Sequence, residues 1–503
     1  MNRRSFLKTT AAASLGAAAQ ATAPSALGAA AADSLIRREN AKPGARDWQL
    51  TRVRLDKTGI RSPAIEGYCS KQSVLAGETL DLFVSTKPAS RFILEIFRTG
   101  YYGGAGARLM TTVGPLKGET QPDPATGEAR LHECRWSTST TLKIPADWPS
   151  GVYLGRLTTV PDATGPYWQS YVIFVVRDQR RAGVLVEVSD NTWQAYNKWP
   201  SNFSLYTDPR AAHVRDIAVS FDRPYGKFPM IFENPQTTGS GEYLAFEYPL
   251  TYWLEQQGYD VTYCSNRDCL DAANLTRCRS FISVGHDEYW DVRQYEAVKR
   301  AIAEGVSVLW LCGNSVFGVT PFTPSGTGQP DRIITRAGHF GGLTDAEVAR
   351  AERVFTKEYK RAGPDESLIM GARTVIPFNG GGDWICTKPD HWVFAGTGMK
   401  AGEAIPGLVG WEHHGAPAKI PGLEIVGQGT VYAGGVTPSD WTAVVFPGPK
   451  NNIVFNAATI FWAQGLATPP GHMLPYSHWS RPHGPDARVQ RITANVMARA
   501  LRA

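Results

Sequence analysis

Apolar residues alternate with polar ones over much of the first third of the chain. Segments such as "TLDLFVST", "FILEIFR", "VYLGRLTTV" and "YVIFVVR" place apolar side chains at every second position, and turn sequences such as "AGET" and "WPSG" separate them. Alternation with a period of two predicts strands that bury one face. Because the strands are short and regularly spaced, residues 67–178 are predicted to form a β-sandwich of two packed sheets.

The pattern changes after the polar segment "RDQRRAG" (177–183). Three apolar runs at 184–188, 281–284 and 306–311 show no alternation, as expected for strands buried on both faces. Apolar residues at helical spacing over 242–258 and 291–305 separate these runs. The order predicts an α/β doubly wound domain (flavodoxin/glutamine amidotransferase-like) over 183–470, preceded by an all-β immunoglobulin-like sandwich. Residues 471–503 are predicted to be a C-terminal extension with a helix from 487 to 501.

The first 32 residues have the features of an export signal. Arg3 and Arg4 precede Phe6, Leu7 and Lys8, and a run rich in alanine follows. This order is typical of a twin-arginine signal, although Asn2 stands where serine or threonine is usual. The sequence therefore predicts a periplasmic or secreted protein, exported already folded through the twin-arginine pathway, with residues 33–66 as a linker.

The net charge and the cysteine content exclude few of the possible functions. The formal net charge is +6, of which the signal supplies three, so the mature chain is near +3 and is not expected to bind nucleic acid. After the signal, no apolar run reaches the roughly 18 residues that a membrane span needs. Seven cysteines leave the disulfide pairing open: Cys69 and Cys134 are one candidate pair, and Cys264, Cys269 and Cys278 are close in sequence.

Polar side chains follow each of the three apolar runs. The stretch after 184–188 contains Tyr196 and Tyr206, "GHDEYW" (285–290) follows 281–284, and "CGNS" (312–315) follows 306–311. Because ligands of open α/β sheets bind beyond the carboxyl ends of the strands, these side chains are predicted to converge on one site.

Each of these residues also has a structural explanation when it is taken alone. Tyr196 and Tyr206 could simply pack against neighbouring side chains, and His286 could donate a hydrogen bond to a backbone carbonyl. Glu288 could stabilise the N-terminus of the following helix, and Asn314 could be a turn residue. Within "GHDEYW", Gly285 is expected to let the backbone turn and Asp287 to cap or brace, while Tyr289 and Trp290 pack as a lid. Convergence at one sheet edge favours the functional interpretation over these alternatives.

The motifs "NTWQAYN", "SLY", "GHDEYW" and "CGNS", with "GYYGGAGARL" and "DWPSGVYLGRL" before them, resemble the large (beta) subunit family of N,N-dimethylformamidase. The resemblance implies a mononuclear iron held by two tyrosinates and a glutamate, which match Tyr196, Tyr206 and Glu288. Tyr225 or Tyr243 could replace Tyr206 as the second ligand. The resemblance also implies that His286 and Asn314 lie nearby, with a further catalytic glutamate at Glu412 or, as an alternative, Glu424.

The chemistry of these residue types is consistent with that arrangement. Two phenolates and a carboxylate are hard anionic oxygen donors whose charges balance Fe3+. Three protein ligands leave positions open for water or a carbonyl oxygen, as amide hydrolysis requires. His286 could move a proton and Asn314 could donate to an oxyanion. The predicted function is hydrolysis of a linear, non-peptide amide C–N bond in a small molecule, with a separate small subunit or a homo-oligomer as candidate assemblies.

Two other functions are compatible with the sequence. Cys312 and His286 could form a thiol amidohydrolase, although no glycine stands two residues before Cys312 and no helical pattern follows it. Alternatively, the protein could be a non-catalytic exported binder of polysaccharide or another surface polymer.

Overall fold

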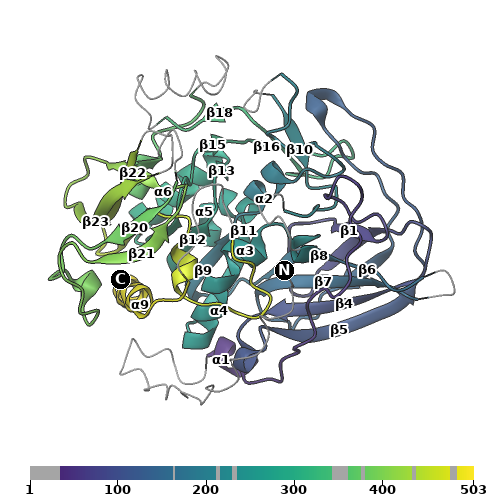
Figure 1. The fold of residues 1–503 in the computed structure, drawn as a ribbon, viewed down its shortest axis with the longest axis horizontal. Helices are drawn as coiled ribbons and strands as arrows, with labels where there is room; N and C mark the ends of the chain where they lie inside the picture. The colour runs from purple at the N-terminus through teal and green to yellow at the C-terminus, as the bar shows by residue number, and fades with distance from the viewer. Residues whose placement is uncertain are drawn as a thin grey trace, which may run out of the picture.

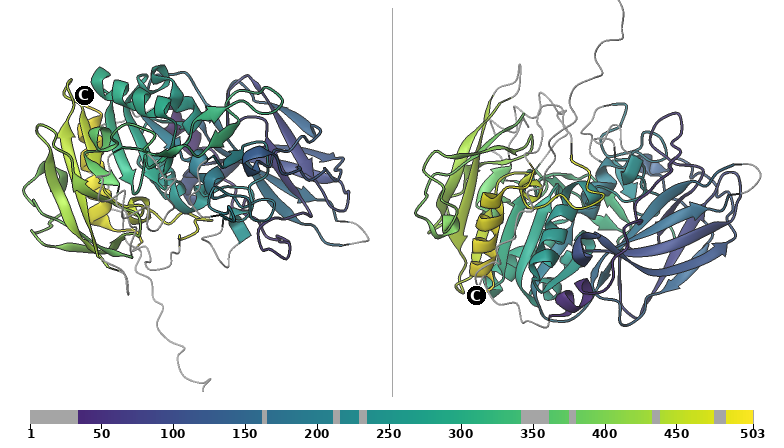
Figure 2. Two further views of the ribbon diagram at one scale, coloured as in Figure 1. Left: turned by 90° about the horizontal axis from the view of Figure 1, so that it is seen from above. Right: turned by 60° about the horizontal axis from the view of Figure 1, so that its bottom comes forward.

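The computed structural model describes residues 34–161, 165–210, 216–228, 235–341, 361–374, 380–432, 438–475 and 484–502. The predicted export signal lies outside the described residues and stays a prediction. Figures 1 and 2 show two β-sheets of the N-terminal region at one end of the molecule, parallel strands in the middle and a group of later strands, β20 to β23, at the other end. In the described part of the chain, no helix combines the length and the apolar character that crossing a membrane requires.

The N-terminal region consists of two sheets that share a core. The larger sheet has the order β2 (Ser73–Leu75), β8 (Gln169–Arg177), β7 (Gly151–Thr159), β4 (Phe92–Thr99) and β5 (Ala107–Leu116), and the smaller has β1 (Glu66–Cys69), β3 (Thr79–Ser85) and β6 (Thr140–Lys143). The alternating apolar positions of both sheets, among them Leu82, Leu94 and Val172, meet in one buried cluster. The short elements of this region are α1 (Leu35–Asn40), η1 (Tyr102–Gly104) and η2 (Glu128–Arg130). The predicted strands are therefore present, and the immunoglobulin-like type of the sandwich stays a prediction.

The central sheet has seven strands in the order β11 (Val261–Ser265), β9 (Ala182–Val188), β12 (Cys278–Gly285), β14 (Ser307–Cys312), β25 (Ile453–Asn456), β24 (Ser439–Pro447) and β23 (Glu424–Val431). The first five strands are parallel, and the last two are antiparallel. The apolar runs at 184–188, 281–284 and 306–311 lie in β9, β12 and β14, as predicted. Their unbroken apolar pattern reflects burial from both sides of the sheet.

Helices cover both faces of the parallel strands. On one face, α4 (Tyr248–Gln257) and α9 (Ala487–Ala500) contribute to the cluster that contains Val186 and Ile282. On the other face, α6 (Val292–Glu304) packs with Phe281 and Trp310. The sequence defines the ends of α6, because the Asp291 carboxylate accepts a hydrogen bond from the Arg293 N–H and Gly305 adopts a φ of 106°. The predicted helix over 291–305 is therefore confirmed.

The predicted fold class is nevertheless wrong. The structure is mostly β-sheet, with 34% strand and 20% helix, and it contains several small sheets that a doubly wound, flavodoxin-like domain lacks. The small sheets are β10 (Ala218–Ser220) with β17 (Ile333–Thr335) and β16 (Phe322–Thr323); β13 (Tyr289–Trp290) with β15 (Gly318–Val319) and β18 (Gly338–His339); β19 (Ala372–Thr374) with β22 (His414–Pro417); and β20 (Gly382–Ile385) with β21 (Ala404–Val409).

The reason for the error lies in the long connection between β14 and β25. Where a doubly wound fold has a crossover helix, the described part of this connection contains strands β15 to β24, the four-residue helix α8 (Ser367–Met370) and η5 (Trp392–Phe394). Except for β21, β23 and β24, these strands have only two to four residues, which is too short to show a hydrophobic period. The other short helices are α2 (Asp190–Tyr196), η3 (Pro235–Thr237), α3 (Tyr243–Phe246), η4 (Asn266–Leu270), α5 (Ala272–Leu275) and η6 (Trp462–Gly465).

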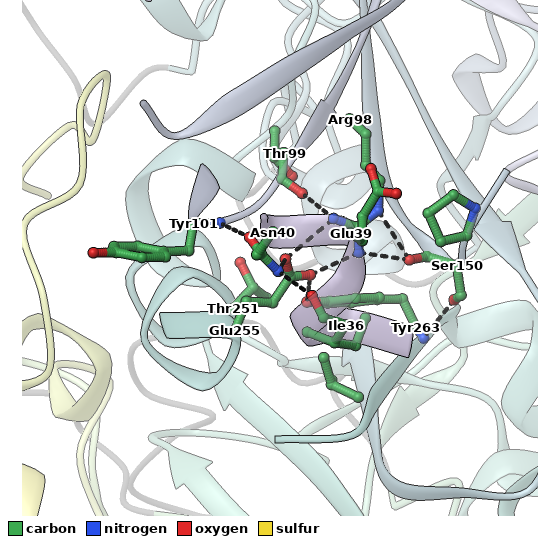
Figure 3. Close-up of polar contacts among 12 residues, drawn as sticks. Ile36, Glu39, Asn40, Arg98, Thr99, Tyr101, Ser150, Thr251, Glu255 and Tyr263 are labelled. Carbon is green, nitrogen blue, oxygen red and sulfur yellow. Dashed lines mark hydrogen bonds and ion pairs between the residues drawn. The ribbon is translucent and has the colours of Figure 1, made fainter. Parts of the chain in front are cut away.

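A buried ion pair joins the N-terminal sheets to the central sheet region, as Figure 3 shows. Arg98 of β4 and Glu255 of α4 lie 2.7 Å apart, and both side chains are fully buried. Glu255 also accepts hydrogen bonds from Asn40 of α1 and from Tyr263 of β11, each at 2.8 Å. Arg98 donates to the carbonyl oxygen of Ser150. The two regions therefore share one network of buried charge.

All seven cysteines lie in described residues, and none forms a disulfide. The sulfur atoms of Cys264 and Cys269 lie 3.4 Å apart. Cys69 and Cys134, which the sequence offered as one candidate pair, are both free.

Candidate active site

The candidate site lies beyond the carboxyl ends of β9, β12 and β14. Gly285, the last residue of β12, has a φ of 71°, and a Cβ atom at this position would lie 2.6 Å from the Cβ atom of Phe246. Only glycine combines this backbone angle with so close a neighbour. The turn leads the chain into His286 and Glu288, as the sequence predicted, and the Glu288 N–H donates to the Thr192 hydroxyl of α2 at 2.9 Å.

Three predicted ligand side chains meet at this turn. The Tyr196 hydroxyl lies 2.8 Å from Oε2 of Glu288, and the Tyr206 hydroxyl lies 2.7 Å from Oε1 of the same carboxyl. The two tyrosine hydroxyls are 2.9 Å apart. Two hydroxyl oxygens and the two oxygens of one carboxyl, from three separate parts of the chain, thus form a compact cluster.

The loop that carries Tyr206 explains how two tyrosines only ten residues apart face the same point. The chain turns back after α2, so that the Leu205 N–H donates to the Ala195 carbonyl at 2.9 Å. Arg223, which is buried, donates to the carbonyl oxygens of Trp199 and Phe203 and holds the loop in this shape. Tyr206 therefore returns to the side of Tyr196.

The alternative second tyrosines lie elsewhere. The Tyr243 hydroxyl makes hydrogen bonds with Thr99 and Thr251, toward the N-terminal sheets. Tyr225 packs edge-on against Trp193. Of the three candidates, Tyr206 is the one that contacts Glu288.

His286 stands between three carboxyl groups. Its Nδ1 lies 2.7 Å from Oε2 of Glu242, and its Nε2 lies 3.1 Å from Oε2 of Glu412 and 3.4 Å from Oε2 of Glu288. Burial alone would lower the pKa of His286, but Glu412 and Glu242 raise it well above its usual value. The imidazole therefore holds a proton in this setting. Its Nδ1 faces Glu242, and its Nε2 faces Glu412 and Glu288.

The structure distinguishes between the two predicted catalytic glutamates. Glu412 lies between β21 and β22, is buried, and contacts His286. A Cβ atom at Gly313 would lie 2.2 Å from the Glu412 carbonyl oxygen, so the glycine of "CGNS" permits this close approach. Glu424, in contrast, pairs with Lys388 at the surface.

Asn314 is buried beside Glu412 in a left-handed conformation, with a φ of 54°. Among the described residues, neither its amide nitrogen nor its amide oxygen makes a hydrogen bond of normal geometry. Burial raises the pKa of Glu412, while His286 and, more weakly, the Asn314 amide act in the opposite direction. A strained, buried amide whose polar atoms lack hydrogen bonds of normal geometry is typical of a functional position.

The electrostatics of the site favour a bound cation. Burial, followed by the charge of Glu288, raises the pKa of both Tyr196 and Tyr206 well above the usual value. Without a cation both phenols keep their protons, and a Lewis acid would be needed to hold them as phenolates. His286, Glu288 and Glu412 also offer ligand atoms within 4.8 Å of one another, which gives a second candidate donor set that shares Glu288.

Comparison with known proteins places the chain in a family. Residues 93–476 match the family described as "N,N-dimethylformamidase beta subunit-like, C-terminal". The chain belongs to this family. No curated protein matches the chain. A family 123 glycoside hydrolase from Clostridium perfringens, studied for glycolipid glycan hydrolysis, is similar over 56% of this chain and 50% of its own length, with 9% identity and a TM-score of 0.13, which is too low to carry an argument.

In this member of the dimethylformamidase beta subunit-like family, Cys312 lies in the core. Its side chain is fully buried, burial raises the pKa of its thiol, and the Ser283 hydroxyl donates to its sulfur at 3.6 Å. Cys312 packs in the cluster on the α6 face of the sheet, whereas His286 contacts Phe246 of the cluster on the other face. A neutral thiol in this position is not set up to act as a nucleophile.

We expect the Cys312→Ala variant to keep amide hydrolysis within about twofold of the parent enzyme, because the thiol takes no part in the chemistry. Steady-state rates on a short linear amide, measured for both proteins at equal concentration of folded protein, test this. Loss of all activity in a folded variant would support the thiol mechanism instead.

Three residues at the site were not predicted to have a part in it. Glu242 reaches His286 from the start of α3, and Arg336 donates to the Tyr289 hydroxyl at 2.6 Å. Tyr289 was expected only to pack, yet its hydroxyl donates to that of Tyr206. Glu242 and Arg336 carry no motif, so no sequence signal identifies them. Asp287 has a structural role, as predicted: its carboxylate accepts hydrogen bonds from Ser283 and Asn266 and so connects the turn after β12 to these residues.

Proposed function

We propose that this chain is a metal-dependent hydrolase of linear amide C–N bonds, with a mononuclear iron, Fe3+, held by Tyr196, Tyr206 and Glu288. Membership of the dimethylformamidase beta subunit-like family supports a dimethylformamidase-like hydrolase. The observation that carries the finer proposal is the compact cluster of oxygen atoms formed by these three side chains.

The dimensions of the oxygen cluster suit a metal ion. With metal–oxygen bonds of about 2.0–2.1 Å, two oxygens at adjacent octahedral positions lie about 2.8–3.0 Å apart. The two hydroxyl oxygens lie 2.9 Å apart, and they lie 2.8 and 2.7 Å from the two oxygens of the Glu288 carboxyl. Without a metal, the same oxygens share protons in hydrogen bonds of normal length. The donor set of two phenols and a carboxyl is also chemically suited to a hard trivalent cation.

The bound metal would supply Lewis acidity, polarising a carbonyl oxygen or lowering the pKa of a water molecule. Hydrolysis adds the water oxygen to the amide carbon, and the C–N bond then breaks to give a carboxylate and an amine. In this scheme the protonated His286 gives its Nε2 proton to the leaving nitrogen, while the Glu412 carboxylate takes up the proton of the attacking water and returns it to Nε2.

The residues around His286 orient its ring for proton transfer. Glu242 accepts the Nδ1–H at 2.7 Å, which fixes the ring orientation and points Nε2 toward Glu288 and Glu412. Glu412 lies close enough to Nε2 to exchange a proton with it. The Asn314 amide is available to donate to the oxyanion that develops on the carbonyl oxygen.

Metal analysis together with a visible absorption spectrum tests the proposal. We expect the purified protein to contain about one iron per chain and to be coloured, because phenolate-to-Fe3+ charge transfer absorbs in the visible. A colourless protein that binds a metal through His286, Glu288 and Glu412 would contradict the tyrosinate assignment. A folded protein that binds no metal and sediments with insoluble glycan in a pull-down would instead support the function of a non-catalytic binding protein.

The remaining parts of the proposal concern location and assembly. We propose that the protein is exported by the twin-arginine pathway and acts in the periplasm or outside the cell, on a small-molecule amide or related compound. A separate small subunit or a homo-oligomer stays a prediction. Cell fractionation of a strain carrying the native chain, compared with Arg3→Lys/Arg4→Lys, tests the location.

A further inference from the structure

A chain of hydrogen-bonded side chains leads away from the proposed metal ligands, through Tyr289 to Arg336. Arg336 donates to the Tyr289 hydroxyl at 2.6 Å, and the Tyr289 hydroxyl donates to that of Tyr206. The guanidinium carbon of Arg336 also lies 4.7 Å from the centre of the Tyr206 ring. Tyr206 therefore receives a hydrogen bond at its oxygen and a positive charge at its ring.

The backbone fixes this chain independently of any ligand. Tyr289 belongs to β13, which pairs with β15 at Gly318. A Cβ atom at Gly318 would lie 2.5 Å from the Tyr289 ring, so the missing side chain leaves room for the ring in this position. Arg336 follows β17, and its N–H donates to the Ile217 carbonyl at 2.9 Å. Both side chains are at most 2% exposed.

The two tyrosines of the site have different surroundings. Tyr206 has Tyr289 and Arg336 behind it, and its hydroxyl is the acceptor of two hydrogen bonds. The Tyr196 ring lies 4.9 Å from the His286 ring, and its hydroxyl contacts Tyr206 and Glu288. Tyr206 is therefore the tyrosine that is held from outside the site by a hydrogen bond at its oxygen and by a guanidinium at its ring.

We propose that Tyr289 and Arg336 are positioning residues that orient Tyr206 toward the metal and set the electron-donor strength of its oxygen through the hydrogen bond from Tyr289. This inference rests on the proposed tyrosinate metal site. Its consequence is an unequal pair of ligands, in which the Tyr206 oxygen, which accepts this hydrogen bond, is the weaker electron donor. Neither positioning residue is one of the proposed ligands or proton-transfer groups.

Tyr289→Phe removes only the hydroxyl that donates to Tyr206. We expect iron to dissociate about tenfold more readily in chelator competition, because one hydrogen bond to a charged group is lost. The visible band should move to longer wavelength, since a phenolate without this donor releases its electron more easily to Fe3+. Arg336→Met should show the same changes, and Arg336→Lys should recover part of both, because it keeps the charge.

Tyr295→Phe is the matched control. It also removes a tyrosine hydroxyl, which donates to the Asp365 carbonyl at 2.8 Å, but this tyrosine belongs to α6 and packs against Phe340. We expect its iron affinity and absorption band to equal those of the parent protein. Thermal unfolding of each metal-free variant shows that the protein is folded, and Tyr289→Phe alone decides the question if Arg336→Met fails to fold.

The outcomes separate the inference from the proposed function. A parent protein that binds iron and absorbs in the visible, with Tyr289→Phe unchanged in both measurements, would overturn the inference and leave the metal site intact. A parent protein with no metal and no visible band would overturn both. Equal changes in Tyr289→Phe and Tyr295→Phe would show a general effect of losing a buried hydroxyl, and would also overturn the inference.

Discussion

Glu288→Gln should abolish iron binding and the visible absorption, and should reduce kcat/KM for amide hydrolysis by about a thousandfold or more. The carboxyl contacts both tyrosine hydroxyls, at 2.8 and 2.7 Å, so its charge is central to the donor set. Glutamine has the same size but is neutral and is a poor ligand for a trivalent cation. Metal content, absorption and steady-state kinetics on a short linear amide measure the three effects.

Glu424→Gln is the control for this substitution. It removes the same charge from a surface glutamate that pairs with Lys388 and does not belong to the site. Metal content and kinetics should match those of the parent protein. If folded Glu288→Gln kept iron with an unchanged spectrum, the ligand assignment would be wrong, and the set of His286 and Glu412 would need to be considered in its place.

The second large effect is expected on stability. Glu255→Ala should lower the free energy of unfolding by about 3–5 kcal/mol, because it leaves the guanidinium of Arg98 buried without its carboxylate. The same substitution removes the hydrogen-bond acceptor of Asn40 and Tyr263. Urea unfolding, followed by tryptophan fluorescence and circular dichroism, measures the loss.

A double variant shows that the loss comes from the unpaired charge. Arg98→Met/Glu255→Met removes both charges and should be more stable than Glu255→Ala, because apolar replacement of a buried ion pair is often tolerated. Arg300→Ala, which breaks an exposed pair with Glu304, should leave the urea midpoint unchanged. A double variant no more stable than Glu255→Ala would contradict this explanation.

The sequence predicts those site residues that come after recognisable apolar runs. The apolar runs that became β9, β12 and β14 are recognisable because they lack alternation, and parallel strands place their carboxyl ends at one edge of a sheet. Tyr196, His286 and Asn314 lie in the segments that come after these strands, so their convergence could be predicted. The family resemblance supplied the pairing of Tyr206 with Glu288, and the fold shows that the loop after α2 can satisfy it.

The parts that the sequence does not predict depend on contacts between distant segments. Glu242 meets His286 across 44 residues, and Arg336 meets Tyr289 across 47. The choice of Glu412 over Glu424 was open for the same reason, since both follow apolar stretches with no distinguishing pattern. The fold class was mispredicted because the connection between β14 and β25 is built of strands, most of which have two to four residues and carry no measurable period.

By itself, the sequence determined the strands and helices with a clear period, the strand ends that carry polar residues and the family. The tertiary structure decided which of these residues meet: the close approach of Glu412 at Gly313, the return of the loop to Tyr206, and the support of Tyr206 by Tyr289 and Arg336. The physical reason is that a hydrophobic period reflects burial within one element, whereas a contact between elements depends on the packing of the whole chain.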